Sequence, residues 1–137
     1  MSRPKRILLV EDDDVDAMSV KRALREIHAA APLTRAKNGE ESLLYLRDSS
    51  HERPGIILLD LNMPRMSGLD FLEIAKQDKT LRSIPVVVLT TSQDAQDRQK
   101  SFDLGAAGYM VKPIEHHDFV DMMQTIEKYW TLSELPT

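Results

Sequence analysis

Five polar residues could do chemistry together, because each of them lies directly behind a short apolar run of the sequence. They are Glu11 and Asp12 after residues 7–10, Asp60 after 56–59, Thr90 after 85–89 and Lys112 after 109–111. A carboxylate at the end of a buried segment is costly unless solvent, a cation or a hydrogen-bonding partner compensates for it. Such a placement indicates a site with a chemical purpose.

These residue types suit phosphoryl chemistry with a divalent cation. Two carboxylates about 4 Å apart repel each other by roughly 4 kcal/mol at an effective dielectric constant near 20. Glu11, Asp12 and Asp60 therefore require a cation, and oxygen ligands without histidine or cysteine favour Mg²⁺, with Mn²⁺ as a substitute. The Lys112 ammonium and the Thr90 hydroxyl can bind a phosphoryl group. A carboxylate beside a metal ion and a lysine, as Asp60 would be, can act as a nucleophile toward phosphorus.

Each residue alone also has an ordinary structural explanation. The acidic run at 11–14 suits the N-terminus of a helix, where aspartate caps backbone N–H groups and negative charge complements the helix dipole. Thr90 alone could cap a helix, and Lys112 alone could lie in solvent at a strand end. The joint pattern is more specific than any of its members, because four strand ends contribute to it.

Short apolar runs alternate with segments of helical spacing along the whole chain. The runs lie at 7–10, 33–37, 56–59, 85–89 and 109–111. Such alternation is typical of a parallel sheet with helices on both faces, and continuous apolar strands agree with burial on both sides. The predicted fold class is a doubly wound α/β domain with five parallel strands, whose ligands bind beyond the carboxyl ends of the strands.

The segments between the runs show helix signals of different strength. Asn38 with Glu41 resembles a capping box, and Ser67 can cap a further helix. The helix at 94–104 is the poorest in apolar residues, and Gly105 is its expected C-terminal stop. The predicted apolar faces are Ala17, Val20, Leu24 and Ile27; Leu43, Leu44 and Leu46; Leu69, Leu72 and Ile74; and Phe119, Met122, Ile126 and Trp130, with Val120 and Met123 beside the last stripe.

Composition excludes several classes of protein. The chain has 137 residues, 42% hydrophobic and 29% charged, as expected for one globular domain. It has no cysteine and therefore no disulfide framework or thiolate metal site. The net charge is −4 and no basic stripe is present, so no nucleic-acid partner is expected. No apolar run reaches the roughly 20 residues of a membrane span, and the sequence reads as cytoplasmic.

The motifs at the strand ends together resemble the receiver domain of two-component response regulators. They are ILLVEDD at 7–13, DLNMPRMSG at 60–68, VVVLTTS at 86–92 and GYMVKP at 108–113. The resemblance implies a flavodoxin-like sheet of order 2-1-3-4-5, an N-terminal tail at 1–6, a receiver domain at 7–128 and a C-terminal tail at 129–137. It also implies a stand-alone receiver that takes a phosphoryl group from a sensor histidine kinase and signals by protein binding or phosphorelay.

The resemblance assigns a role to each site residue. Asp60 matches the phospho-acceptor, Thr90 the switch hydroxyl, Lys112 the phosphoryl-binding lysine and Tyr109 the aromatic switch. The metal ligands are matched by Glu11, Asp12 and Asp60, together with the backbone carbonyl of Asn62. Lys112-Pro113 occupies the position of a cis peptide in the family.

Three alternatives remain open from the residues themselves. A Mg²⁺-dependent phosphatase of the haloacid-dehalogenase type also uses an aspartyl nucleophile, but its general acid would stand at Asn62, which has no proton to give. A nucleotide or flavin module would need a glycine-rich phosphate loop, which the five glycines do not form. A scaffold that never receives phosphate would not need the complete set of acids, threonine and lysine.

The sequence also suggests where the signal leaves the domain. We expect a homodimer through the helix at 94–104, the fifth strand and the last helix, because apolar residues beyond the core stripe remain there. The tail YWTLSELPT at 129–137 resembles the ends of small receivers that are paired with bacterial phytochrome kinases. A phytochrome is therefore the expected kinase class.

Overall fold

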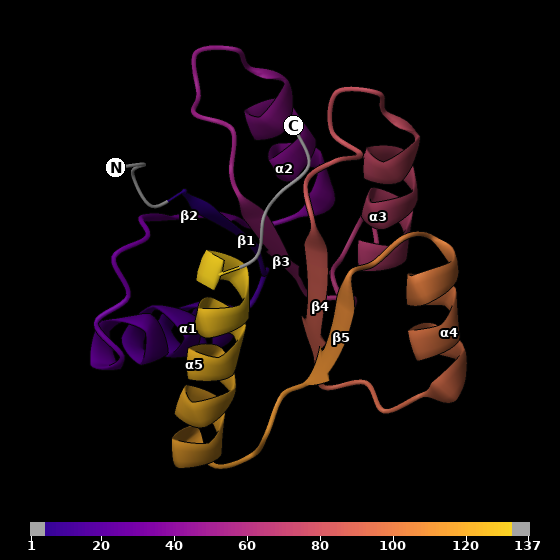
Figure 1. Ribbon diagram of the computed structural model, residues 1–137. Coiled ribbons are helices and arrows are strands. Elements are labelled where there is room, and N and C mark those ends of the chain that lie inside the picture. The colour runs from indigo at the N-terminus through magenta and orange to yellow at the C-terminus, as the bar shows by residue number, and fades with distance from the viewer. Residues whose placement is uncertain (1–4, 133–137) are drawn as a thin grey trace.

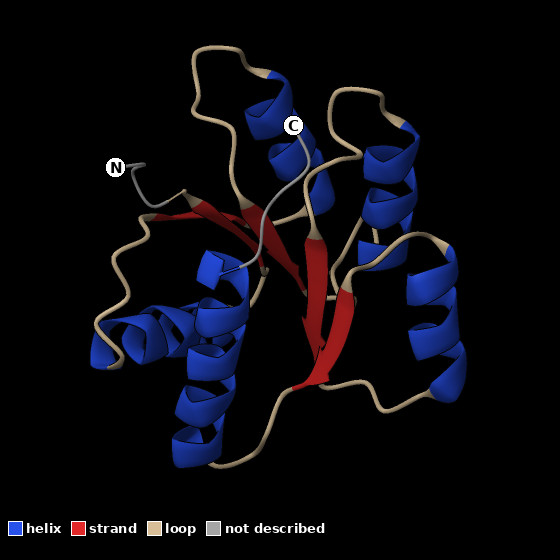
Figure 2. Cartoon of the chain, in the orientation of Figure 1, coloured by secondary structure: helices blue, strands red, loops and turns tan. Residues whose placement is uncertain are grey.

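The computed structural model describes residues 5–132, which form five strands and five helices in strict alternation (Figures 1 and 2). The elements are β1 (Ile7–Val10), α1 (Asp14–Glu26), β2 (Leu33–Ala36), α2 (Gly39–Arg47), β3 (Ile56–Leu59), α3 (Gly68–Gln77), β4 (Val86–Thr90), α4 (Ala95–Asp103), β5 (Gly108–Val111) and α5 (His116–Leu132). Each strand agrees with its predicted apolar run to within one residue at either end.

All neighbouring strands pair in parallel, in the order β2-β1-β3-β4-β5. The three central strands are buried along their whole length, as continuous apolar runs require. The predicted fold class and strand order are confirmed. Because β1 and β3 are neighbours, as are β3 and β4, the residues that follow these strands meet at one edge of the sheet.

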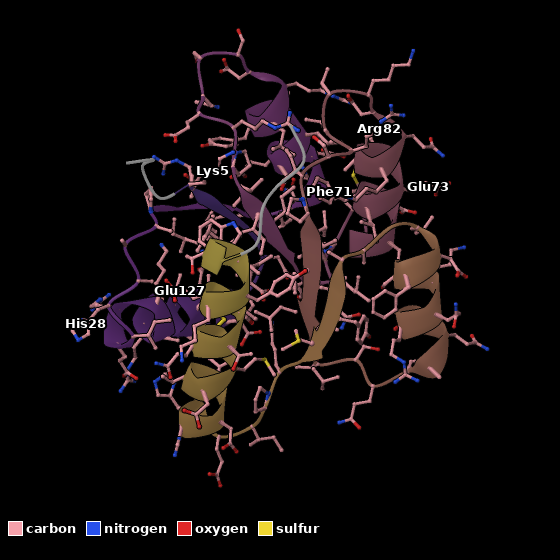
Figure 3. The ribbon with its side chains drawn as sticks, viewed as in Figure 1. Lys5, His28, Phe71, Glu73, Arg82 and Glu127 are labelled. Atoms are coloured by element: carbon pink, nitrogen blue, oxygen red, sulfur yellow. The ribbon has the colours of Figure 1, made fainter. Side chains whose placement is uncertain are left out.

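Helices cover both faces of the sheet and enclose two hydrophobic cores. α1 and α5 pack on one face, and α2, α3 and α4 lie on the other (Figure 1). In α3, Phe71 is fully buried against the sheet while Glu73 of the same helix projects outward (Figure 3). The two cores hold the central strands rigidly from both sides, which fixes the positions of the strand ends.

Helix termini follow the predicted capping signals. Asn38 Oδ1 accepts a hydrogen bond from the Glu41 N–H at 2.8 Å, and Ser67 Oγ accepts one from the Asp70 N–H at 3.2 Å. Gly105 follows Leu104, the C-cap of α4, and its φ of 105° is disfavoured for residues with a side chain. The N–H groups of Gly105 and Ala106 donate to the carbonyls of Phe102 and Ser101, which is the Schellman arrangement.

The predicted apolar face of α5 was partly wrong. Met123 is only 1% exposed and belongs to the core, whereas Met122 and Val120 are half-buried. The buried stripe is Phe119, Met123, Ile126 and Trp130. The predicted stripe with Met122 and the observed stripe with Met123 both agree with 3.6 residues per turn. Packing of α5 against α1 and the sheet selects the stripe with Met123.

Two further side chains differ from the predicted faces. Leu44 was placed on the buried face of α2, but it is 74% exposed. Phe71 was not among the predicted apolar residues of α3, yet it is one of the largest fully buried side chains. α2 and α3 contact each other as well as the sheet, and this packing determines which residues of each helix turn inward.

The far edge of the sheet is held more weakly. Within α4, all of which the structure describes, Ser101 is the only buried residue, and every residue of β5 is half-buried. Phe102 is 46% exposed. The low apolar content of this segment therefore produces a helix with little core anchorage, as its sequence predicted.

α5 continues past residue 128, where the sequence suggested a domain boundary, and Trp130 is buried in the core. The end of the expected tail, residues 133–137, lies outside the described residues. Among residues 5–132, no helix is both long enough and apolar enough to cross a membrane.

Candidate functional site

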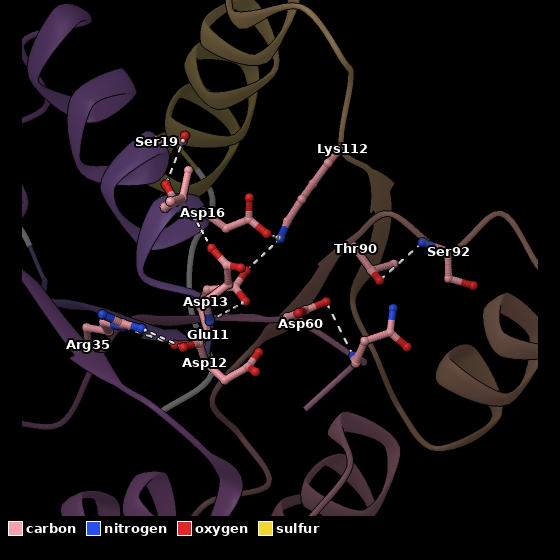
Figure 4. Close-up of polar contacts among 12 residues, drawn as sticks. Glu11, Asp12, Asp13, Asp16, Ser19, Arg35, Asp60, Thr90, Ser92 and Lys112 are labelled. Atoms are coloured by element: carbon pink, nitrogen blue, oxygen red, sulfur yellow. Dashed lines mark hydrogen bonds and ion pairs between the residues drawn. The ribbon is translucent and has the colours of Figure 1, made fainter. Parts of the chain in front are cut away.

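Three carboxylates from two strand ends form the centre of the site (Figure 4). Glu11 and Asp12 follow β1, Asp60 follows β3, and carboxylate oxygens of all three lie within 4.8 Å of one another. Glu11 and Asp60 are buried, and the Asp60 N–H donates to the carbonyl of Val10. Parallel pairing of β1 with β3 therefore brings together acids that are 48 or more positions apart in the sequence.

A glycine allows the loop behind Asp60 to fold tightly. A Cβ on Gly68, the first residue of α3, would lie 2.4 Å from the Asp60 carbonyl oxygen and 2.6 Å from Leu61 Cα. Both neighbours are backbone atoms, which cannot move aside. The Gly68 N–H donates to the Leu61 carbonyl at 3.0 Å, so the glycine fixes the start of α3 against the end of β3.

Lys112 reaches the acids from the end of β5. Its Nζ donates to Glu11 Oε1 at 2.6 Å and to Asp16 Oδ2 at 3.4 Å. Burial acts to lower the pKa of Lys112, but the hydrogen bond and charge of Glu11, with the charges of Asp60 and Asp16, raise the pKa above its usual value. The ammonium therefore keeps its proton in this site.

The same environment shifts the pKa of Glu11 as well. Burial raises the pKa of Glu11 to about 7, although the hydrogen bond from Lys112 opposes the rise, and the charge of Asp60 adds to it. Two buried carboxylates thus share one ammonium. The acids therefore carry more negative charge than Lys112 balances, and a further cation would neutralise the excess.

Thr90 and Tyr109 are linked through one loop. Thr90, the last residue of β4, is fully buried, and its Oγ accepts a hydrogen bond from the Ser92 N–H at 3.3 Å. The Tyr109 hydroxyl donates to the Ser92 carbonyl at 3.0 Å from β5. Ser92, in the segment after β4, is therefore hydrogen-bonded to both Thr90 and Tyr109, the two side chains predicted to be the switch residues.

The peptide between Lys112 and Pro113 is trans, so the expectation of a cis bond was wrong. The trans form of such a bond is favoured by about 0.5–1 kcal/mol. Lys112 nevertheless reaches the acids, because its backbone is held by a hydrogen bond from its N–H to the Thr90 carbonyl at 2.7 Å.

The donor set fits a divalent cation. The side-chain ligands predicted at this site, Glu11, Asp12 and Asp60, are all carboxylates, which suit Mg²⁺ or Mn²⁺, and of these three only Glu11 forms an ion pair with Lys112. The fourth predicted ligand, the Asn62 carbonyl, lies on the exposed segment that follows Asp60. The Asn62 N–H donates to Asp60 Oδ1 at 3.4 Å, which keeps this segment folded toward the site.

A pocket of about 190 Å³ adjoins the lysine side of the cluster. Its lining includes Asp16 and Ser19 of α1, Thr91, and the segment Lys112–Ile114. Thr91, the residue after the buried Thr90, contributes a small, exposed side chain to this lining.

Several site residues were not identified from the sequence. Asp16 is the second partner of Lys112, Ser92 joins Thr90 to Tyr109, and Gly68 permits the turn after Asp60. Arg35 of β2 holds the loop that carries Glu11 and Asp12. A usable signal existed for Asp16, since it lies four positions after Asp12 at the start of a predicted helix.

The fold and the site define a class: a doubly wound α/β protein that gathers acids, a lysine and a buried hydroxyl at the carboxyl ends of its strands. Residues 7–124 match the response regulator receiver domain family. The chain belongs to this family and is a phospho-acceptor signalling protein of two-component systems, which implies a partner histidine kinase.

Known relatives support the assignment along almost the whole chain. Response regulator Rcp1 of Synechocystis sp. is 37% identical over 131 residues, 93% of this chain and 89% of Rcp1. The probable methanogenesis regulatory protein FilR2 of Methanothrix harundinacea is 34% identical over 130 residues, 93% of this chain and 84% of FilR2.

Solved structures give the same result. The phosphorylated cyanobacterial phytochrome response regulator RcpA has a TM-score of 0.91 and 34% identity, covering 98% of this chain and 99% of its own. The Mn²⁺-bound form of Rcp1 has a TM-score of 0.89 and 36% identity, covering 98% of this chain and 100% of its own. Receiver domains typically bind a divalent metal, as this Rcp1 structure does.

Proposed function

We propose that Asp60 accepts a phosphoryl group from a phosphohistidine of a sensor histidine kinase. The observation that carries this proposal is the arrangement of Asp60, a buried carboxylate within 4.8 Å of two further acids and within the electrostatic reach of Lys112. An Oδ atom of Asp60 attacks phosphorus, the new P–O bond forms as the P–N bond breaks, and the imidazole leaves with the electron pair of that bond.

The remaining side chains neutralise and orient the transferred group. Lys112 supplies positive charge, and Thr90, whose oxygen already accepts from Ser92, donates its O–H to a phosphoryl oxygen. A divalent cation held by Glu11, Asp12, Asp60 and the Asn62 carbonyl would neutralise the excess negative charge of the acids. We extend the proposal to self-catalysed loss of the phosphoryl group by hydrolysis at the same site.

Intact-mass measurement with acetyl phosphate and Mg²⁺ tests the acceptor. The wild type should gain one phosphoryl group, and Asp60→Asn should gain none. Asp70→Asn, which removes an exposed carboxylate at the start of α3, is the matched control and should be labelled like the wild type. Undiminished labelling of Asp60→Asn would overturn the assignment, and sustained turnover of small phosphate esters would favour the phosphatase alternative instead.

Exposed apolar residues beside the site support a protein as the phosphoryl donor. The fully exposed Ile114 lines the pocket that adjoins Lys112. Val15 and Met18 of α1 are also exposed, and they are sequence neighbours of Asp16 and Ser19, which line the same pocket. Three such residues next to an acidic site favour docking of a protein surface. Ile114→Ser should reduce transfer from the cognate kinase at least about tenfold and reduce labelling by acetyl phosphate far less.

The similarity to RcpA and Rcp1 supports a bacterial phytochrome as the kinase partner. Phosphotransfer profiling against all histidine kinases of the host tests this part of the proposal. Fastest transfer from a phytochrome kinase is the expected result. Preference for a kinase without a light-sensing module would contradict it.

We further propose a homodimer through α4, β5 and α5. Phe102 and Tyr129, at 46% and 69% exposure, provide apolar surface on the two helices, whereas Met123 and Trp130 belong to the core and are unavailable. Sedimentation with and without beryllofluoride, a phosphoryl mimic, should show a dimer that Tyr129→Ser weakens. A wild type that stays monomeric at high concentration in both states would rule the dimer out.

A further inference from the structure

One arginine holds the loop that carries two of the three acids. Arg35 is the second-last residue of β2. Its Nε donates to the Glu11 carbonyl at 2.9 Å, and one terminal nitrogen donates to the Asp12 carbonyl at 3.0 Å. Its other terminal nitrogen donates to Asp14 Oδ1 at 2.7 Å. The guanidinium thus makes three hydrogen bonds to a stretch of four residues.

These contacts determine which way the loop faces. The Glu11 N–H is bound by the Ala36 carbonyl of β2, and the Asp13 N–H donates to Glu11 Oε2 at 3.3 Å. With the carbonyls of Glu11 and Asp12 held by Arg35, their side chains lie on the side of the loop where the Asp60 carboxylate stands. The Arg35 side chain is only 14% exposed, so water can replace few of these contacts.

We propose that Arg35 is a positioning residue for the metal site: it fixes the loop so that Glu11 and Asp12 meet Asp60, and thereby sets the affinity for the cation. The inference rests on the proposed function, because it assumes that these acids bind a divalent ion. Groups that orient metal ligands from outside the first coordination layer commonly change metal affinity by about 10–100-fold when they are replaced.

The geometry of the guanidinium, and not its charge, accounts for this role. A positive charge near the acids disfavours a cation, so electrostatics alone would not place an arginine here. The planar guanidinium presents fixed donors that reach two neighbouring carbonyls and a carboxylate together, whereas a lysine has one flexible ammonium. Arg35→Lys therefore keeps the charge and removes the arrangement of donors.

Titration of the full-length protein with Mn²⁺, followed by the electron paramagnetic resonance signal of the free ion, measures the predicted effect. Arg35→Lys should bind Mn²⁺ about 10–100-fold more weakly than the wild type. The Mg²⁺ concentration for half-maximal labelling by acetyl phosphate should rise by the same factor, while the rate at saturating Mg²⁺ stays within about twofold. A general loss of folding would lower that saturating rate instead.

Two further variants serve as controls. Arg6 donates to Thr34 Oγ at 2.9 Å near the other end of the same two strands, so Arg6→Gln removes a comparable contact away from the loop and should bind Mn²⁺ like the wild type. Asp14→Asn removes the ion pair but leaves both carbonyl contacts, and its affinity should remain within about threefold of the wild type. An Asp14→Asn defect as large as that of Arg35→Lys would overturn the role of the carbonyl contacts.

Hydrogen exchange of the metal-free protein separates this inference from the proposed function. The amides of residues 12–16 should exchange faster in Arg35→Lys than in the wild type. In Arg6→Gln they should exchange at the wild-type rate. Wild-type Mn²⁺ affinity in Arg35→Lys would overturn the inference, whatever the exchange shows. A wild type that neither binds Mn²⁺ nor accepts phosphate would refute the proposed function, and unchanged loop exchange in Arg35→Lys would then refute the positioning role as well.

Discussion

The layer formed by α1 and α5 and the edge formed by α4 and β5 are built very differently. α1 buries Ala17, Val20, Ala23 and Leu24, and α5 buries Phe119, Met123, Ile126 and Trp130 against the same face of the sheet. At the α4–β5 edge, the only residue that α4 buries along its fully described length is Ser101, and β5 is half-buried throughout. Both regions contribute to the site, since Asp16 lies on α1 and Lys112 follows β5.

We infer that the α1–α5 layer supplies stability and that the α4–β5 edge is the part that can move. Segments with few buried apolar contacts open locally at a lower free energy than the core does. A charged group that forms in the site can therefore shift the α4–β5 edge more readily than the α1–α5 layer. Tyr109 and Ser92 connect this edge to Thr90, so a change at the proposed phosphoryl site could reach the edge through these two hydrogen bonds.

The largest expected effect is on the stability of the α1–α5 layer. Met123→Ala should lower the free energy of unfolding by about 2–5 kcal/mol, because it removes a fully buried side chain. Met122→Ala, on the same helix but half-buried, is the matched control and should cost clearly less. Denaturation in urea measures both values, and equal losses would show that the two methionines are packed alike.

A smaller effect is expected where α4 ends. Gly105→Ala should destabilise the protein by about 1–3 kcal/mol, because the φ of 105° suits glycine and a Cβ would lie 3.2 Å from Lys76 Cγ.

Gly108→Ala in β5 is the control for this prediction. Its Cβ would meet Val87 methyl groups at an ordinary 3.7 Å, and the loss of backbone freedom in the unfolded chain should stabilise the protein by about 0.5–1 kcal/mol. Urea denaturation of both variants should thus give shifts of opposite sign. A stabilising Gly105→Ala would show that this turn adopts another conformation.

The smallest effect concerns a polar link inside the stronger layer. Glu26 of α1 accepts a hydrogen bond from His116 of α5 at 3.2 Å, and this contact lowers the pKa of Glu26 below its usual value of 4.5. A carboxyl with a depressed pKa in the folded state stabilises the protein above its unfolded pKa, and this stability is lost as the pH falls through the folded pKa.

The wild type should therefore lose slightly more stability than Glu26→Gln when the pH is lowered from about 5 to 3. Thermal unfolding at a series of pH values measures the difference. Parallel curves for the two proteins would show that the link contributes nothing, and the layer would then depend on apolar packing alone.

The sequence by itself determined the fold class, the strands and the residues that lie at their ends. Continuous apolar runs separated by helical segments leave few arrangements other than a covered parallel sheet, and parallel strands necessarily deliver their ends to one edge. That is why Glu11, Asp12, Asp60, Thr90 and Lys112 could be selected together. Caps such as Asn38 and Ser67 were also predictable, because a cap depends on residues only three positions apart.

Only the tertiary structure decided how these residues are paired. Lys112 bonds to Glu11 across 101 positions, and Arg35 reaches the Glu11 carbonyl across 24. The choice of Met123 over Met122 for the core depends on the position of α1, which local periodicity does not contain. Periodicity and capping act within one helix or strand, whereas partners, burial and charge balance depend on distances between segments that are brought together only when the chain folds.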